Sequence, residues 1–376
     1  MTRVAALPWL LLALLLPLAC GRPAPCIGVL LPQTGAFQEW GLEAREGLEM
    51  AWDEIDPEHT LRLVFVDTES REDLIPELVG QLVEQHGATT IIGPLTTGHT
   101  LIAGASAMNW EVPLVTPSAT GEDVTVGNAW VFRLCYSDPE VAQALAQFAR
   151  YDLKLQRLAV VVDLANAYSV GLADRFSQEF VRVRGRIISE VAHYDGPDEL
   201  ATALDRVAEL DVQGALVVEY HDNLIAMMRG ASDPRLAELV LLGSDGWEGP
   251  DVGAAMAGRV AGAYYTSHFC PDEGDVPTDR QALVAGFLQR YAERHGGTPP
   301  TDFVALGYDA GRAVLSVFDP NQDGPGMASR LGSLRHVGVT GRLQLDANRS
   351  AQGKSMVFEQ LHRSDGASRF VKRSRG

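Results

Sequence analysis

Short apolar runs alternate along the chain with longer segments in which apolar residues recur at helical spacing. Before position 56, Ala44, Leu48, Ala51 and Ile55 follow one another at intervals of four, three and four, which places them on one face of a helix. The strands expected in the first part of the chain are Ile27–Leu31, Leu61–Val66, Thr90–Ile92 and Pro113–Val115. The expected helices are one that runs through Ile55, then Asp73–His86 and Thr100–Asn109.

The same alternation begins again after Asp138. The strands expected there are Leu158–Val162, Ile187–Val191, Ala215–Val218 and Leu239–Leu242. The expected helices are Glu140–Tyr151, Ala173–Val183, Glu199–Leu210 and Asn223–Gly230. Strands that alternate with helices are typical of parallel sheets built from βαβ units. Two successive sets predict an α/β fold with two doubly wound lobes.

Composition and charge narrow the classes of partner. The 376 residues fit two domains at about 150 residues each, and 46% hydrophobic with 21% charged residues is ordinary for a globular protein. The formal net charge is −18, and Lys and Arg cluster only in the short tail 369–375. Nucleic acid and anionic membrane surfaces both require concentrated positive charge, so neither is an expected partner of the folded body.

The first residues carry the pattern of an export signal. Arg3 precedes the apolar run Val4–Leu18, and small residues follow it, so residues 1–19 are expected to be a signal peptide. The segment Pro17–Cys20 resembles a bacterial lipobox, in which Cys20 would be lipidated and become the first residue of the exported chain. An ordinary signal peptide cut near Ala19, or a short anchor helix, is the alternative. After this segment no apolar run reaches the ~20 residues that span a bilayer.

The sequence lacks the common motifs of enzymes and metal sites. The sequence contains no G-x-S-x-G, no G-x-x-x-x-G-K-[ST] and no H-E-x-x-H, so no catalytic function is expected. Residues 319–324 (DPNQDG) imitate the start of a calcium loop, but Arg330 stands where a bidentate Glu is required, which favours a polar turn. No cysteine pair has the spacing of zinc ligands, and a Cys135–Cys270 disulfide is an open alternative. We expect no metal and no cofactor.

Polar residues collect where the expected strands end, which is where open α/β sheets bind ligands. Thr97 lies in a Thr-rich segment after Thr90–Ile92, and Ser118 and Thr120 follow Pro113–Val115. Their hydroxyls, with free N–H groups at a helix start, suit an anion such as a carboxylate, although N-capping alone would also explain them. In the second set Tyr168, Tyr220 and Asp245 follow successive strands, and an acid at a strand end suits an ammonium group. Together the two groups describe a site for a zwitterion.

Several motifs, taken in order, resemble the leucine/isoleucine/valine-binding group of type I periplasmic binding proteins, over residues 27–358. They are 27–37 (IGVLLPQTGAF), 40–41 (WG), 91–96 (IIGPLT), 116–120 (TPSAT), 131–133 (VFR), 243–247 (GSDGW) and 305–310 (ALGYDA). These proteins are the substrate-binding components of ABC importers for amino acids. The resemblance implies a non-catalytic protein that captures an amino acid, a branched-chain or other aliphatic one included, and delivers it to permease and ATPase subunits.

The resemblance also assigns roles to residues. Thr97, Ser118 and Thr120 would hold the ligand carboxylate, partly through backbone N–H groups, and Asp245 would hold the ammonium group. Tyr168 and Tyr220 would close over the ligand from the second lobe, and Trp40 would form part of the side-chain pocket. The prototypes have Ser in place of Thr97 and Glu in place of Asp245. The shorter carboxylate moves the ammonium anchor by ~1.5 Å, so the resemblance supports amino-acid binding but not specificity for leucine.

The lobe boundaries follow from the resemblance as well, with three chain crossings at a hinge. The first lobe would comprise residues 26–138 and 268–350, and the second 139–267 and 351–376. The implied protein is an exported monomer, periplasmic or at the cell surface, held to the membrane only by its lipid. Two rival functions remain: a sensing module that reports amino acids or small amides to a receptor or regulator, and an enzyme that uses Asp245 and His268 as acid and base.

Overall fold

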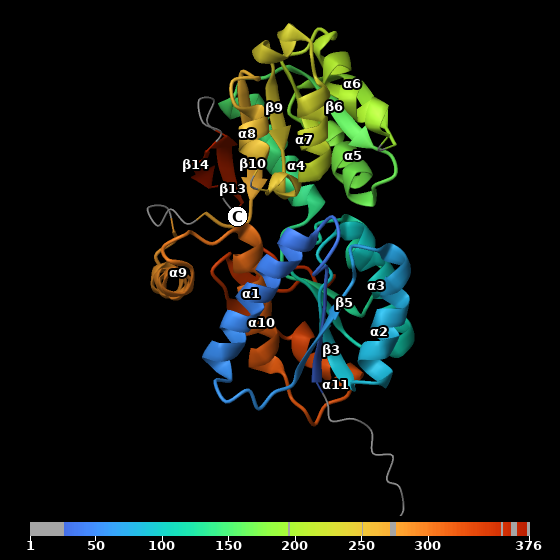
Figure 1. Cartoon of the computed structure of the whole chain (residues 1–376), viewed down its shortest axis with the longest axis vertical. Helices are drawn as coiled ribbons and strands as arrows, with labels where there is room; N and C mark the ends of the chain where they lie inside the picture. Colours follow the sequence, from blue (N-terminus) through green and yellow to red (C-terminus); the bar gives the residue numbers. More distant parts are fainter. Residues whose placement is uncertain are drawn as a thin grey trace, which may run out of the picture.

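The structure is a computed structural model that describes residues 26–373 except 195, 250, 271–275, 355 and 362–366. Figure 1 shows two lobes stacked along the long axis, each built around its own sheet. Cys20 and the expected signal peptide 1–19 lie outside the described residues. Within the described ranges, no helix combines the length and the apolar character that crossing a membrane requires. The prediction of two doubly wound α/β lobes is confirmed at the level of the sheets.

Lobe 1, the lower lobe in Figure 1, contains a five-stranded parallel sheet with the order β2-β1-β3-β4-β5. Its strands are β1 (Cys26–Leu31), β2 (Leu63–Asp67), β3 (Ala88–Ile92), β4 (Leu114–Thr116) and β5 (Val131–Arg133). One face is covered by α1 (Gln38–Ile55), α10 (Asp302–Val317) and α11 (Gly324–Gly332). The other face is covered by α2 (Ile75–Glu84) and α3 (Thr97–Trp110), and α9 (Gln281–His295) packs against α1 and α10.

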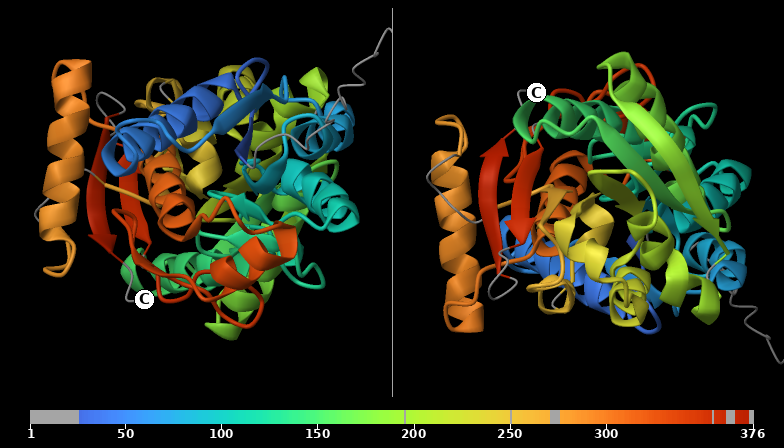
Figure 2. Two further views of the ribbon diagram at one scale, coloured as in Figure 1. Left: turned by 90° about the horizontal axis from the view of Figure 1, so that it is seen from below. Right: turned by 90° about the horizontal axis from the view of Figure 1, so that it is seen from above.

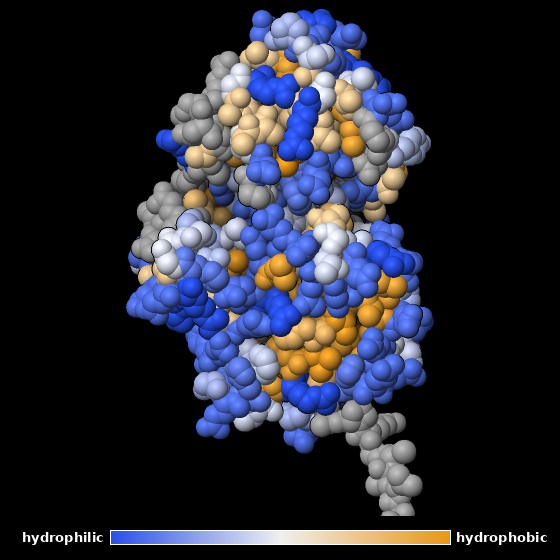
Figure 3. Space-filling model, viewed as in Figure 1, coloured by the Kyte–Doolittle hydropathy of each residue, from blue (hydrophilic) through white to orange (hydrophobic). Residues whose placement is uncertain are grey.

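The alternation of side chains in β1 explains the two layers of lobe 1. Ile27, Val29 and Leu31 pack against α1 and α10, whereas Leu30 packs toward α2 and α3. The edge strand β2 is half-buried, and the Arg45 guanidinium lies 4.4 Å from the centre of the Phe65 ring. Figure 3 shows an apolar area on this lobe in the region between α1 and α2.

Lobe 2 contains a seven-stranded sheet with the order β14-β13-β10-β9-β8-β6-β7. Its strands are β6 (Arg157–Asp163), β7 (Arg186–His193), β8 (Gly214–Val218), β9 (Val240–Gly243), β10 (Gly262–Ser267), β13 (Val357–Leu361) and β14 (Ser368–Arg373). The helices α4 (Asp138–Gln147) and α5 (Ala167–Arg182) cover one face. The other face is covered by α6 (Pro197–Ala208), α7 (His221–Gly230) and α8 (Val252–Met256). Strands β13 and β14 join antiparallel, and the rest of the sheet is parallel.

The chain passes between the two sheets three times: from β5 to β6, from β10 to α10, and from the small hairpin of β11 (Arg335–Val337) and β12 (Arg342–Gln344) to β13. The segments are tied to one another: Arg133 pairs with Ser350 in an isolated bridge, and buried Lys354 donates to the carbonyl of Leu134 at 2.8 Å. Seen along the long axis in Figure 2, the C-terminal strands and the orange helix α9 lie on the same side of the molecule, and Figure 1 places the strands above the helix. The residue limits proposed for the lobes remain a prediction.

The expected elements differ from the observed ones mainly at their ends. α3 begins at Thr97 and α5 at Ala167, so that Thr97 and Tyr168 lie in first helical turns rather than in loops. Cys135 is a buried free thiol, so the open alternative of a Cys135–Cys270 disulfide is wrong. The calcium-like segment is a turn that leads into α11, where the Asp323 carboxylate accepts from the N–H of Gly326. Among the described residues no group of three or more His, Cys, Asp or Glu side chains is placed to hold a metal.

Candidate functional site

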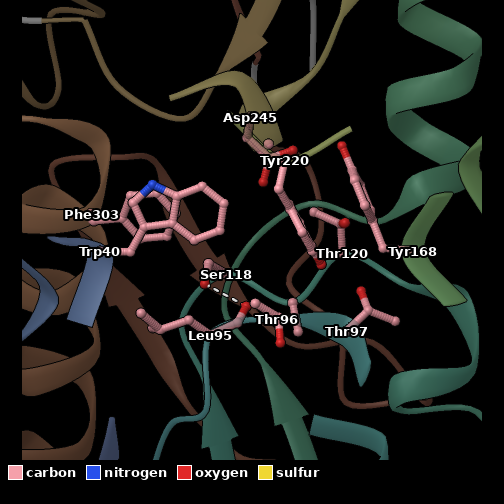
Figure 4. Close-up of a pocket in the computed structure, with 12 residues that line it drawn as sticks. Trp40, Leu95, Thr96, Thr97, Ser118, Thr120, Tyr168, Tyr220, Asp245 and Phe303 are labelled. Carbon is pink, nitrogen blue, oxygen red and sulfur yellow. Dashed lines mark hydrogen bonds between the residues drawn. The ribbon is translucent and has the colours of Figure 1, made fainter. Parts of the chain in front are cut away.

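A cavity between the lobes is lined by every ligand-binding residue expected from the sequence (Figure 4). The expected members are Trp40, Thr97, Ser118, Thr120, Tyr168, Tyr220 and Asp245. Leu95, Thr96, Ala119, Gly246 and Phe303 complete the lining. Threonines and Ser118 come from lobe 1, and the two tyrosines and Asp245 face them from lobe 2. The ligand contacts of these residues stay predictions, because no ligand is present.

The wall of lobe 1 is built by loops at the ends of β3 and β4. Thr97 opens α3, and its hydroxyl oxygen accepts from the N–H of Gly121 at 3.1 Å, which leaves the O–H free to donate. Ser118 differs, because its O–H donates to the carbonyl of Leu95 at 2.8 Å (Figure 4). A ligand anion at this wall would therefore find the Thr97 hydroxyl as a donor, while the Ser118 hydroxyl oxygen remains an acceptor.

A buried arginine holds the Thr120 turn in place. The Arg133 Nη1 donates to the carbonyls of Thr120 and Gly121 at 2.9 and 2.6 Å, and its Nε donates to Ser350 Oγ at 2.9 Å. The side chain is 3% exposed. Because charged hydrogen bonds away from water are strong and directional, Arg133 fixes the lobe 1 wall relative to the third crossing segment.

Asp245 provides the negative side of the site. It lies in a short 3₁₀ turn directly after β9 and is 8% exposed. Its Oδ2 lies 3.3 Å from Nε2 of His268, a buried ring whose pKa burial lowers, whereas Oδ1 is buried without a hydrogen-bond partner. An unpartnered buried carboxylate oxygen is costly, and a ligand ammonium would supply the missing partner. Asp245 and His268 are thus neighbours, as the acid–base hypothesis required, although His268 does not line the cavity.

The aromatic residues form the remaining walls. Tyr168 stacks on Tyr220 with ring centres 5.2 Å apart, and its hydroxyl contacts Ser244. Burial raises the pKa of both tyrosines, so their hydroxyls remain protonated at neutral pH. Trp40 stacks on Phe303 at 4.7 Å and meets Tyr220 edge-on. Its Nε1 donates to the carbonyl of Glu248 in lobe 2 at 2.8 Å, which ties the lobes together beside the cavity.

Asp138 is a charged residue that sequence reasoning used only as a lobe boundary. It begins α4, donates its N–H to the carbonyl of Thr120 at 2.8 Å, and is 1% exposed. Neither carboxyl oxygen has a hydrogen-bond partner. Burial, to which the nearby charge of Asp245 adds, raises its pKa from 3.8 to about 7. The sequence signal was Ser137–Glu140, a capping box that starts a helix directly after the first crossing.

Replacing Asp138 by Asn should change how stability depends on pH. An acid whose pKa is 3.8 unfolded and about 7 folded holds its proton in the folded state alone between those values. Its contribution to stability is therefore present at low pH and is lost as pH rises toward 7. Compared with the parent, Asp138→Asn should be more stable at pH 8, by at most about 4 kcal/mol, and nearly equal at pH 4. Thermal unfolding at both pH values measures the difference.

Asp174→Asn, on the exposed side of α5, is the matched control and should leave the pH dependence unchanged. The stability of Asp138→Asn should still decrease somewhat as pH rises, because burial also raises the pKa of Glu43 to about 7 and that of Asp302 to about 8. Equal destabilisation of Asp138→Asn at both pH values would contradict a buried, protonated Asp138.

Comparison with known proteins agrees with this architecture. The sequence profile of the periplasmic binding proteins matches residues 26–366, nearly all of the described chain. The chain belongs to the periplasmic binding protein family. The resemblance to its leucine/isoleucine/valine-binding group is confirmed by Leu/Ile/Val-binding protein homolog 3 of Brucella melitensis biotype 1, which is 30% identical over 271 residues, 69% of this chain and 71% of the relative. This family comprises exported substrate-binding proteins with a non-catalytic fold.

Solved structures of periplasmic binding proteins superpose over almost the whole chain. The leucine binding protein LivK of Thermotoga maritima has a TM-score of 0.80 and 26% identity, and covers 94% of this chain and 99% of its own. LivJ of Streptococcus pneumoniae, solved with isoleucine, has a TM-score of 0.79 at 23% identity, covering 93% and 99%. A solute binding protein of R. palustris, solved with benzoate, has a TM-score of 0.78 at 18% identity, covering 94% and 96%. The fold is thus shared by proteins that were solved with chemically different ligands.

Proposed function

We propose that this periplasmic binding protein captures an α-amino acid between its lobes and delivers it to the permease and ATPase subunits of an ABC transporter. The observation that carries the proposal is the buried, unpartnered Oδ1 of Asp245 in a cavity whose opposite wall offers the Thr97 hydroxyl. A ligand ammonium group would donate a hydrogen bond to Asp245 Oδ1, and a ligand carboxylate would accept one from the Thr97 hydroxyl. A zwitterion carries both groups.

The negative charge of Asp245 favours amino acids over aromatic acids as ligands. A benzoate carries one negative charge and has no group to pair with Asp245. Its carboxylate would share a water-poor cavity with the Asp245 side chain, which is 8% exposed. Like charges in a low-dielectric site repel strongly, so this site favours ligands that bring a positive charge.

Closure of the lobes would complete the site. The Trp40–Glu248 hydrogen bond and the contact of Trp40 with Tyr220 join residues of different lobes, so they form only when the lobes approach. Opening at the hinge would break them and admit water and ligand. A permease can distinguish the closed pair of lobes from the open one, which couples capture to delivery.

Attachment and partners complete the proposal. We infer export through the signal peptide 1–19 and lipid anchoring at Cys20, so that a monomer held near the membrane meets its permease. Several acyl chains on one cysteine would anchor it stably, whereas a single chain binds only weakly. Cys20 lies outside the described residues, and the anchor rests on the lipobox-like sequence alone.

A thermal-shift screen against the twenty amino acids tests the proposed function. A ligand present at 100 times its Kd adds about 2.7 kcal/mol to the stability of the folded state, which corresponds to roughly 3–5 °C in Tm for a protein of this size. We expect such a shift with at least one amino acid. The corresponding amine without the carboxylate, and the acid without the amine, should give little or no shift. A shift with benzoate and none with any amino acid would contradict the proposal.

A further inference from the structure

A second cavity lies beside the first, and Trp40 lines both. Its volume is about 290 Å³, against about 20 Å³ for the cavity that contains Asp245 and Thr97. Besides Trp40, its lining consists of Glu39, Glu43, Trp247, Glu248, Gly249, Val252, Gly253, Tyr265, Thr301, Leu361 and Ala367. The smaller cavity has room for about one water molecule, so the head of an amino acid would fit there only after the lobes move slightly apart. The side chain attached to that head would find its space in the second cavity.

The second cavity is strongly acidic. Glu39 and Glu43 contribute from α1 and Glu248 from lobe 2, and none of the described lining residues is Lys, Arg or His. The Oε2 atom of Glu248 is buried and has no hydrogen-bond partner. A buried carboxylate oxygen that lines an open space without a partner points to a group that would occupy the space and donate to it.

Other carboxyl groups surround these side chains. Burial raises the pKa of Glu248 well above its usual range, and the charges of Asp302, Glu359 and Glu43 raise it further, while hydrogen bonding to Tyr265 lowers it. Burial also raises the pKa of Glu43 to about 7, against a hydrogen bond to Thr301. Without a cation nearby these carboxyl groups therefore tend to keep their protons, and a cation that enters the cavity would favour their ionised form.

The other walls suit an organic cation. Trp40, Trp247 and Tyr265 line the cavity, and aromatic faces attract ammonium and guanidinium groups while they pack against alkyl carbons. Carboxylates and aromatic rings together are the chemistry that recognises a positively charged group on an apolar stem. Aliphatic ligands such as leucine would leave the buried Glu248 oxygen without a partner.

We propose that this second cavity binds an organic ammonium or guanidinium group. Two sources share this chemistry: the side chain of a basic amino acid whose zwitterionic head occupies the Asp245 cavity, and a separate amine. The first source rests on the proposed function and would make the ligand a basic amino acid, with its alkyl chain running past Trp40. The second source does not depend on amino-acid binding.

Calorimetric titration of the purified protein with lysine and norleucine tests the first source, because the two ligands share four side-chain carbons and differ in the terminal ammonium. Lysine should bind at least about tenfold more tightly. Glu248→Gln and Glu43→Gln should each remove most of this preference while they change norleucine binding little. Glu58→Gln, in an exposed loop, is the matched control and should change neither. Titration with n-butylamine in the absence of any amino acid tests the second source, because a bound norleucine side chain would occupy the same cavity.

The outcomes separate the two proposals. A preference for lysine that depends on Glu248 and Glu43 supports the side chain as the source, and butylamine binding that depends on them supports a separate amine. Norleucine binding with no lysine preference and no butylamine binding would overturn the cation site and leave the proposed function intact. If no amino acid binds while butylamine does, the proposed function fails and the cation site stands.

Discussion

Asp245→Ala is expected to lower amino-acid affinity by at least about 30-fold while the fold stays intact. The substitution removes the carboxylate that would face the ammonium group of the proposed ligand, in a site where water is largely excluded. Loss of one partner of such a buried charge pair costs 2–5 kcal/mol, or about 30-fold to several thousand-fold in Kd. Calorimetry with the best ligand from the screen measures the loss, and thermal unfolding of the free protein verifies the fold.

Two variants sharpen this result. Asp245→Asn keeps the shape and the approach to His268 but removes the charge, so it should lose nearly as much affinity as Asp245→Ala. Asp174→Ala, on the exposed side of α5 in the same lobe, should bind like the parent. Unchanged affinity in Asp245→Ala would remove the basis of the proposed site.

Gly307→Ala should cause a large loss of stability. α1 and α10 cross at backbone contact, and a methyl group on Gly307 would lie 2.0 Å from the carbonyl oxygen of Ala44. Carbon and oxygen atoms cannot approach so closely, and the obstacle is backbone, so the two helices must move apart. Overpacking of this kind costs 1–3 kcal/mol or more, which corresponds to a decrease in Tm of roughly 2–4 °C or more for a protein of this size. Thermal unfolding measures it.

The neighbouring glycines provide the tests of this explanation. A methyl group on Gly47 would lie 1.9 Å from the carbonyl oxygen of Val304, so Gly47→Ala should be destabilising for the same reason. Gly332, at the end of α11, has no atom within 4 Å of that position, and Gly332→Ala should leave Tm nearly unchanged. Equal Tm values for Gly307→Ala and Gly332→Ala would contradict this explanation, because they would mean that α1 and α10 can move apart without loss of stability. Ligand affinity should fall in Gly307→Ala as well, because α1 carries Trp40 and α10 carries Phe303.

Much of the architecture could be predicted from local patterns. The spacing of apolar residues placed the strands and helices because burial of one face leaves a periodic trace in the sequence. Thr97 and Ser118 could be named as neighbours in one lobe, and Tyr220 and Asp245 in the other, because the carboxyl ends of parallel strands meet at one edge of each sheet. The structure brings them to one cavity, and their contacts with a ligand remain predictions. The ordered sequence motifs indicated the family, and the comparisons with known proteins confirm it.

Other features of the site and the fold left no signal in the local sequence. Phe303 starts α10 beyond the second crossing, and it meets Trp40 only because α1 and α10 pack side by side. The predicted ends of helices differ from the observed ones. Apolar spacing marks the middle of a helix, whereas its first residue depends on capping by single side chains, such as Asn166 before α5.

The sequence alone thus determined that the chain forms two α/β lobes, which polar side chains stand at the strand ends, and the family to which the chain belongs. Only the tertiary structure decided how the lobes meet. It brought His268 to Asp245, buried Asp138 beside Thr120, and enclosed Glu43 and Glu248 in an acidic cavity behind Trp40. The physical reason is that burial and charge repulsion depend on groups from distant segments, and these groups become neighbours only when the two lobes close on each other.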